Sequence, residues 1–224
     1  MTVTETLSRL RKCRVVPVLT IEDASIAIDL AKAFLAGGID VLEVTLRTDA
    51  GIQVIERIKQ SGLNCLVGAG TVTTSDDVKN CQIAGADFLV SPATPRELID
   101  PLLNFDGVAL PGAATPTEAL TLSRHGFNCI KFFPAEAAGG VKMLKALAAP
   151  LPTIEFMPTG GITAESAETY LSLPNVVAIG GSWLCNDQDM NDRAWEKVTN
   201  KARRVQEIRP QSFGQQPLHP QKRT

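Results

Sequence analysis

The chain has 224 residues, of which 44% are hydrophobic, a net charge of −2 at pH 7 and a mean hydropathy of +0.06. This near-neutral charge excludes the basic surface by which proteins bind nucleic acid or anionic membranes. No apolar run approaches the roughly 18 residues of a membrane-spanning helix, and the charged first residues lack the apolar centre of a signal peptide. We therefore expect a globular protein with neither a nucleic-acid nor a membrane partner.

The cysteines and histidines indicate the compartment and the absence of a structural metal. No two cysteines form a CxxC pair, and His125 and His219 lie outside any metal-ligand spacing. Widely spaced thiols are typical of a reduced, cytoplasmic protein, and we expect no metal and no cofactor. The five cysteines are Cys13, Cys65, Cys81, Cys129 and Cys185.

Apolar strands and amphipathic helices alternate along most of the sequence. A short lead-in helix is predicted over residues 4–12. The predicted strands are 15–19, 41–46, 65–70, 88–91, 108–111, 129–133, 154–157 and 176–180. The predicted helices that follow them are 21–36, 50–60, 75–84, 95–103, 116–124, 141–148, 164–171 and 190–205.

This order of elements predicts a single (β/α)8 TIM barrel with a short N-terminal helix, because the strand–helix units recur every roughly 19–26 residues. Thr94 and Thr115 each begin a predicted capping box with proline at the next position. An open doubly wound sheet uses the same units, but eight units without a change of pattern favour closure. Residues 1–205 are expected to form the barrel, and 206–224, which lose the periodicity, a flexible tail.

Lys131 stands in the middle of an apolar strand, between Ile130 and Phe132. A lysine on an edge strand, or one that extends its ammonium to water, is the ordinary explanation. The alternative is a desolvated lysine whose pKa is lowered until the neutral amine attacks a carbonyl and forms a Schiff base. The strand alone leaves both explanations open.

Other polar residues fall where the active site of a TIM barrel lies, at the carboxyl ends of the strands. Glu43 and Arg47 alternate with apolar residues in the second strand and are expected to point into the barrel mouth. Thr71 follows the third strand after Gly68-Ala69-Gly70, although a plain tight turn explains that run as well. An amine, a carboxylate and a guanidinium suit cleavage of a carbon–carbon bond in an oxo acid through an iminium.

Two Gly-Gly pairs, Gly160-Gly161 and Gly180-Gly181, lie where the seventh and eighth strands end. Backbone N–H groups in such loops bind anions, and TIM barrels often hold a substrate phosphate at these two loops. A single Gly-Gly pair is also common in ordinary turns, whereas two pairs at these positions indicate a phosphate site. The pattern therefore predicts a phosphorylated oxo acid as substrate.

From about Val15 to Arg204 the sequence resembles the class I 2-keto-3-deoxy-6-phosphogluconate (KDPG) aldolases of the KDPG/KHG aldolase family. The motifs that carry the resemblance are Glu43-Val44-Thr45-Leu46-Arg47-Thr48, Gly68-Ala69-Gly70-Thr71, Ile130-Lys131-Phe132-Phe133-Pro134-Ala135-Glu136, Pro158-Thr159-Gly160-Gly161-Ile162 and Gly180-Gly181-Ser182-Trp183-Leu184. The resemblance implies an aldehyde-lyase that reversibly cleaves KDPG to pyruvate and glyceraldehyde 3-phosphate. It also implies a cytoplasmic homotrimer that needs no metal.

The resemblance assigns roles to individual residues. Lys131 corresponds to the Schiff-base lysine and Glu43 to the general acid and base. Arg47 and Thr71 would hold the pyruvate carboxylate, with the backbone at Pro92 nearby.

The same resemblance places the rest of the substrate. Phe133 would pack beside the imine, and Thr159 would contact the substrate hydroxyls and influence stereochemical preference. The phosphate site would consist of Gly160, Gly161, Gly181 and Ser182.

The sequence departs from the family pattern at Ala93, where many members have glycine, and in the tail after about Val205. Two functional alternatives stay open. The site could act mainly on the galactonate epimer or on 4-hydroxy-2-oxoglutarate, or the barrel could bind a sugar phosphate as a non-catalytic sensor. The sensor explains Lys131 less well, because binding alone requires no buried amine.

Overall fold

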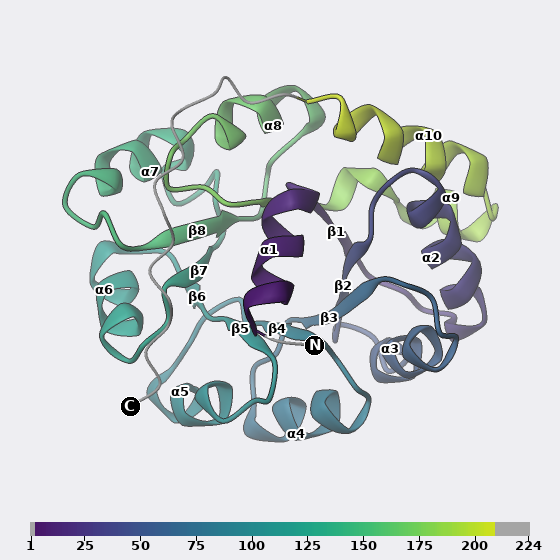
Figure 1. Ribbon diagram of the computed structural model, residues 1–224, viewed down its shortest axis with the longest axis horizontal. Coiled ribbons are helices and arrows are strands. Elements are labelled where there is room, and N and C mark those ends of the chain that lie inside the picture. Colours follow the sequence, from purple (N-terminus) through teal and green to yellow (C-terminus); the bar gives the residue numbers. More distant parts are fainter. Residues whose placement is uncertain (1–2, 209–224) are drawn as a thin grey trace.

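The computed structural model of the protein describes residues 3–208 (Figure 1). The strands are β1 (Val15–Leu19), β2 (Val41–Thr45), β3 (Leu66–Gly70), β4 (Phe88–Val90), β5 (Val108–Leu110), β6 (Gly112–Ala113), β7 (Cys129–Phe132), β8 (Glu155–Pro158) and β9 (Ile179–Gly181). The helices are α1 (Val3–Cys13), α2 (Ala27–Ala36), α3 (Gly51–Gln60), α4 (Ser75–Ile83), α5 (Arg96–Leu103), α6 (Pro116–Arg124), α7 (Gly140–Ala148), α8 (Ala164–Leu171), α9 (Asp187–Asn191) and α10 (Trp195–Gln206). Two 3-10 helices, η1 (Ala24–Ile26) and η2 (Ser182–Leu184), complete the described elements.

Within residues 3–208, all paired strands are parallel and form two sheets, ordered β5-β4-β3-β2-β1-β9 and β6-β7-β8. Isolated bridges, Phe156 to Val176 and Thr159 to Gly180, connect β8 with the segment that contains β9. Figure 1 shows the strands at the centre and helices α2 to α10 around them. The protein thus has an α/β fold with parallel strands, as the alternating pattern predicts.

The strands are apolar along their whole length because both of their faces are covered. Every residue of β1, β2 and β3 is buried, which is typical of parallel sheets between helices and a filled interior. Among the buried aromatic residues, Phe132 and Phe156 pack edge to face with ring centroids 6.2 Å apart. This packing fixes β7 against β8, and therefore fixes the strand that carries Lys131.

Helix α1 lies across the amino ends of the strands, since its last residue comes two positions before β1 (Figure 1). Arg9 forms an ion pair with Asp40 at 2.8 Å and donates to the backbone carbonyl of Asn64 at 3.2 Å. Arg11 pairs with Glu155, the first residue of β8. These contacts hold α1 at the end of the strands opposite to their carboxyl ends.

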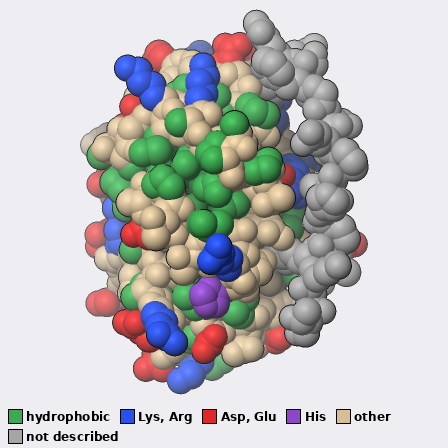
Figure 2. All heavy atoms as spheres, turned by 90° about the vertical axis from the view of Figure 1, so that its left-hand side faces the viewer, with side chains coloured by type: hydrophobic (Ala, Val, Ile, Leu, Met, Phe, Trp, Pro, Cys, Tyr) green, Lys and Arg blue, Asp and Glu red, His purple; other side chains and the backbone are tan. Residues whose placement is uncertain are grey.

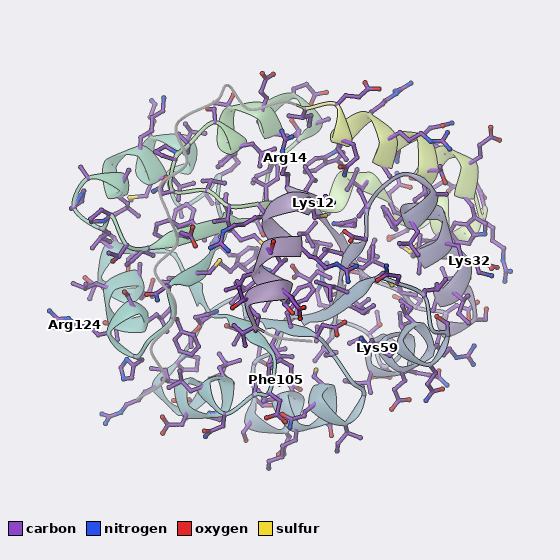
Figure 3. The ribbon with its side chains drawn as sticks, viewed as in Figure 1. Lys12, Arg14, Lys32, Lys59, Phe105 and Arg124 are labelled. Atoms are coloured by element: carbon purple, nitrogen blue, oxygen red, sulfur yellow. The ribbon has the colours of Figure 1, made fainter. Side chains whose placement is uncertain are left out.

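The last described residues return to the same end of the molecule. Arg14, labelled in Figure 3 just beyond α1, donates to the backbone carbonyl of Ile208. Helix α10 ends at Gln206, one residue beyond the predicted boundary of the barrel. Most of the predicted tail, residues 209–224, lies outside the described residues. No helix within residues 3–208 is long and apolar enough to cross a membrane.

Some predicted element boundaries are wrong. Thr94 does not cap α5: its hydroxyl donates to the carbonyl of Gly112 at 3.1 Å, and Pro95 is the N-cap. The predicted helix 190–205 is two helices, α9 and α10, and the predicted helix 21–36 starts later, at η1 and α2. The capping box at Thr115 is confirmed, with Glu118 reaching back to the Thr115 N–H at 2.9 Å.

Candidate active site

Lys131 lies on β7, which is paired on both sides, with Gly112 of β6 and Met157 of β8. Its side chain is only 5% exposed. An edge-strand lysine or one that reaches water is therefore the wrong explanation for this residue. Its Nζ donates to Oε1 of Glu43 at 3.1 Å, although the two residues are 88 positions apart.

The carboxylate of Glu43 occupies space that a neighbouring glycine leaves free. A Cβ at Gly70, on the adjacent strand β3, would lie 2.3 Å from Glu43 Oε1. Any side chain at Gly70 would therefore displace the carboxylate from Lys131. From the sequence alone, Gly70 could leave room for a ligand near Thr71. In the structure, Gly70 leaves room for the side chain of Glu43.

Lys131 and Glu43 are both buried. Glu43 is 0% exposed, and its Oε2 has no hydrogen-bond partner among residues 3–208. Burying a carboxylate oxygen without a partner costs free energy, and such groups often mark functional sites. Lys131 Nζ also lies 5.3 Å from the centre of the Phe133 ring, which covers one side of the amine. One oxygen of Glu43 is thus free to bind a substrate hydroxyl or a water molecule.

The thiol closest in sequence to Lys131 offers no competing nucleophile. Burial, with a contribution from the charge of Glu155, raises the pKa of Cys129 to about 12. The thiol is therefore protonated at neutral pH, and thiols react as thiolates. The amine of Lys131 is the nucleophile that β7 can supply.

Arg47 lies two residues after the end of β2 and is exposed. Its Nη2 donates to Thr20 Oγ1 at 2.5 Å, and its Nε donates to Thr45 Oγ1 at 3.4 Å. The two hydroxyls are themselves 3.0 Å apart. Two threonines thus hold the guanidinium at the carboxyl ends of β1 and β2.

The sequence-based prediction missed both of these threonines. Thr45 lies between Glu43 and Arg47 on the same face of the strand. The alternation that identified those two residues as inward-facing therefore applies to Thr45 as well. Thr20 directly follows β1. Its position at the carboxyl end of a strand could have identified it as a candidate site residue.

The loops after β8 and β9 lie side by side. Thr159 bridges to Gly180, and a Cβ at Gly180 would lie 2.3 Å from Thr159 Oγ1. That hydroxyl is buried and has no partner among the described residues. Gly160 and Gly161 both have left-handed backbone conformations, with φ of +102° and +78°, so side chains there would be strained.

The remaining predicted site residues lie at the same end of the strands. Thr71 directly follows β3 in a left-handed conformation with φ of +62°, which is uncommon for threonine and typical of functional sites. Pro92 lies two residues after β4, while Gly181 ends β9 and Ser182 begins η2. Among residues 3–208, the side chain of Lys131 donates a hydrogen bond to Glu43 and to none of these residues.

Comparison with known proteins identifies the family of this site. The family model described as KDPG and KHG aldolase matches residues 6–201. A 2-dehydro-3-deoxy-phosphogluconate aldolase of Pseudoalteromonas atlantica is 46% identical over 85% of this chain and 89% of its own. The KHG/KDPG aldolase of Escherichia coli K12 is 38% identical over 86% of this chain and 91% of its own.

A solved structure extends the comparison to the chemistry. The KDPG aldolase of Legionella pneumophila, with pyruvate captured at low pH as a covalent carbinolamine intermediate, superimposes with a TM-score of 0.86. It is 39% identical and covers 89% of this chain and 97% of its own. The chain belongs to the KDPG and KHG aldolase family.

Proposed function

We propose that the protein is a class I aldolase that reversibly cleaves KDPG to pyruvate and glyceraldehyde 3-phosphate through a Schiff base on Lys131. The observation that carries this proposal is the buried Lys131 amine 3.1 Å from the buried Glu43 carboxylate. The Legionella pneumophila relative, in which pyruvate was captured as a carbinolamine, supports the same chemistry. A buried amine has no role in a sugar-phosphate sensor, whereas it is the nucleophile of this reaction.

In this mechanism the neutral amine of Lys131 attacks the C2 carbonyl carbon of KDPG, and loss of water from the carbinolamine leaves an iminium. Glu43, directly or through a water molecule, takes the proton of the C4 hydroxyl. The C3–C4 bond then breaks, its electron pair moves toward the iminium, and glyceraldehyde 3-phosphate leaves. The resulting enamine is protonated at C3 and hydrolysed, which releases pyruvate and regenerates the amine.

Arg47 and Thr71, with the backbone at Pro92, would bind the carboxylate of the oxo acid. The guanidinium lies at the carboxyl end of β2, where Thr20 and Thr45 orient it, and guanidinium groups bind carboxylates well. Phe133 would cover the imine, as it now covers the amine at 5.3 Å.

The buried hydroxyl of Thr159, which has no hydrogen-bond partner within residues 3–208, would contact the substrate hydroxyls. The phosphate would bind at the carboxyl ends of β8 and β9, where backbone N–H groups suit an anion. Gly160 and Gly161 follow β8, Gly181 ends β9 and Ser182 begins η2.

Reduction with borohydride in the presence of pyruvate, followed by intact and peptide mass measurement, tests the proposal. We expect a stable adduct on the peptide that contains Lys131. If folded protein forms no adduct, the aldolase mechanism is wrong and the sensor becomes the better explanation. Comparing rates on KDPG, on its galactonate epimer and on 4-hydroxy-2-oxoglutarate then separates the substrate alternatives.

We propose in addition that the two sheets form one closed (β/α)8 barrel within residues 1–205. Only Pro111 separates β5 from β6, and its carbonyl accepts from the Lys131 N–H at 2.9 Å. β5 and β6 can thus be counted as one strand that pairs with β4 and then with β7. On the other side, the N–H of Val177 donates to the carbonyl of Phe156 at 3.0 Å, which supports closure between β8 and β9.

We propose that the protein acts in the cytoplasm as a homotrimer. Five buried free thiols favour a reducing compartment. Figure 2 shows hydrophobic side chains gathered on the face formed by α6 and α7. Leu120 on α6 is 40% exposed, and Val141 and Met143 on α7 are partly buried. Contiguous exposed apolar surface of this kind supports an interface between copies of the chain.

Replacing Leu120 with glutamate should dissociate or weaken such a trimer, because a charge would be buried in the interface. Light scattering on the purified protein would measure the mass of the assembly. Ile83→Glu is the matched control, since Ile83 on α4 is 81% exposed and lies outside the proposed face. A trimer that Leu120→Glu leaves intact, or a monomeric wild-type protein, would contradict the proposed interface.

Replacing Thr20 with valine should raise the KM for the oxo acid by about 10-fold with little change in kcat. The change removes the hydroxyl that accepts from Arg47 at 2.5 Å, and a hydrogen bond to a charged group contributes about 1.5–3 kcal/mol. Steady-state kinetics measures the effect, and Thr20→Ser, which keeps the hydroxyl, should restore the KM. Equal effects of valine and serine would show that the hydroxyl does not orient Arg47.

A further inference from the structure

Glu136 and Tyr170 form a contact that joins two consecutive strand–helix units. Glu136 lies in the turn between β7 and α7, and Tyr170 lies on α8. The phenol of Tyr170 donates to Oε1 of Glu136. Burial, together with the hydrogen bond and the charge of Glu136, raises the pKa of Tyr170 above its usual value, so the phenol stays a neutral donor. Tyr170 is fully buried, whereas Glu136 is exposed.

Glu136 also holds the glycine loop through its backbone. Its N–H donates to the carbonyl of Gly160 at 3.1 Å, and the N–H of Ala135 donates to the carbonyl of Thr159 at 2.8 Å. One residue therefore binds the loop after β8 with its main chain and the helix after that loop with its side chain. Residues 160–163 form the loop that leads into α8, between the backbone contact at Gly160 and the side-chain contact at Tyr170.

Three glycines leave the space that this arrangement requires. A Cβ at Gly161 would lie 2.7 Å from Glu136 Cγ, and one at Gly160 would lie 3.2 Å from the Phe133 ring. A Cβ at Gly140, the first residue of α7, would lie 3.0 Å from Tyr170 Oη. The glycine loop is thus packed directly against the side chain of Glu136.

The charge of Glu136 makes its orientation important. A carboxylate beside a site for a phosphate group repels the phosphate unless the carboxylate points elsewhere. The hydrogen bond from Tyr170 directs Oε1 toward α8, and the packing of Gly161 on Cγ fixes the stem of the side chain. Losing the phenol would release both the loop and the negative charge.

We propose that Glu136 and Tyr170 are positioning residues that fix the Gly160–Gly161 loop in the conformation that binds the substrate phosphate. The inference rests on the proposed function and adds a pair of residues that act on the phosphate through the loop. Neither residue is expected to touch the carbon atoms that react. The pair should therefore affect phosphorylated substrates and leave the imine chemistry at Lys131 unchanged.

The test is aldol addition of pyruvate to glyceraldehyde 3-phosphate and to unphosphorylated glyceraldehyde, with kcat and KM measured for each acceptor. Tyr170→Phe, which removes only the hydroxyl, should raise the KM for the phosphorylated acceptor by about 10-fold, the loss expected for one charge-assisted hydrogen bond. The KM for glyceraldehyde and the borohydride trapping of pyruvate should stay within about 2-fold of wild type.

Two further variants separate positioning from charge. Glu136→Ala should raise the same KM, whereas Glu136→Gln, whose carbonyl can still accept from Tyr170, should rescue most of the loss. If charge alone mattered, both variants would lower the KM for the phosphorylated acceptor, and the proposal would be wrong. Glu168→Ala is the control for removing an exposed carboxylate from α8. It should change the KM for neither acceptor.

Ser182→Ala distinguishes failure of this inference from failure of the proposed function. Because Ser182 belongs to the proposed phosphate site, loss of its hydroxyl should raise the KM for the phosphorylated acceptor and leave the KM for glyceraldehyde unchanged. Suppose that Ser182→Ala raises the KM for the phosphorylated acceptor alone, whereas Tyr170→Phe and Glu136→Ala leave the kinetics of both acceptors unchanged or slow both reactions equally. The positioning role is then overturned and the proposed function stands. If wild type does not prefer the phosphorylated acceptor, both proposals fail.

Discussion

Replacing Lys131 with alanine should abolish turnover, with kcat falling by about 10⁴-fold or more, the scale seen when a catalytic nucleophile is removed. Its Nζ is the buried amine beside Glu43, and the thiol of Cys129 on the same strand is protonated at neutral pH because its pKa is raised to about 12. No other group on β7 can replace the amine. Release of pyruvate from KDPG is the measurement, followed by borohydride trapping of the variant with pyruvate.

The control for this variant concerns folding. Removing Lys131 leaves Glu43 buried without its partner, and breaking a buried ion pair costs about 3–5 kcal/mol. Lys131→Met keeps most of the apolar stem, and the double variant Lys131→Met, Glu43→Gln removes both charges together. A folded but inactive double variant, shown by thermal unfolding, would assign the loss to chemistry. Turnover in folded Lys131→Ala, or an adduct on another peptide, would show that the nucleophile is a different residue.

The strand positions were predictable because covered parallel strands have a simple signature. The predicted strand 15–19 and the predicted helices 116–124 and 164–171 coincide with β1, α6 and α8. In each case a continuous apolar run or a capping threonine marks the boundary locally. The end of the fold at which the predicted site residues on strands lie was predictable for the same reason, since the carboxyl ends of parallel strands meet there.

Features that depend on contacts distant in sequence were not predictable. Thr94 has the local pattern of a cap, but a carbonyl 18 residues away, that of Gly112, binds its hydroxyl instead. The pairing of Lys131 with Glu43 spans 88 residues, and no periodicity gives that distance. Only the assembled structure shows that Gly70 makes room for a carboxylate rather than for a ligand.

Arg47 lies just beyond the part of β2 to which the alternating pattern applies. The period of two in β2 ends at Thr45, so it does not determine where the side chain two residues later points. Hydrogen bonds to Thr20 and Thr45 decide its orientation. A residue just beyond a strand therefore needs its neighbours on the adjacent strand before its direction can be assigned.

Replacing Glu43 with glutamine should slow turnover by about 10²- to 10⁴-fold, the usual contribution of general acid–base catalysis. The amide oxygen of glutamine can still accept from Lys131, as Oε1 does at 3.1 Å, so the amine should keep its position and still form the imine. What the variant lacks is a group that takes up and returns a proton at Oε2, the oxygen without a partner within residues 3–208.

Two measurements separate these steps. Borohydride trapping of pyruvate should continue, whereas exchange of the pyruvate methyl protons with D₂O, followed by NMR, should slow as much as turnover does. Gly70→Ala supplies an independent test, because its Cβ would lie 2.3 Å from Glu43 Oε1 and force the carboxylate to move. Slow exchange in both variants, with imine formation retained, would assign proton transfer to Glu43 at its present position. Exchange at the wild-type rate in Glu43→Gln would remove the carboxylate from the mechanism and leave Lys131 with an unidentified proton acceptor.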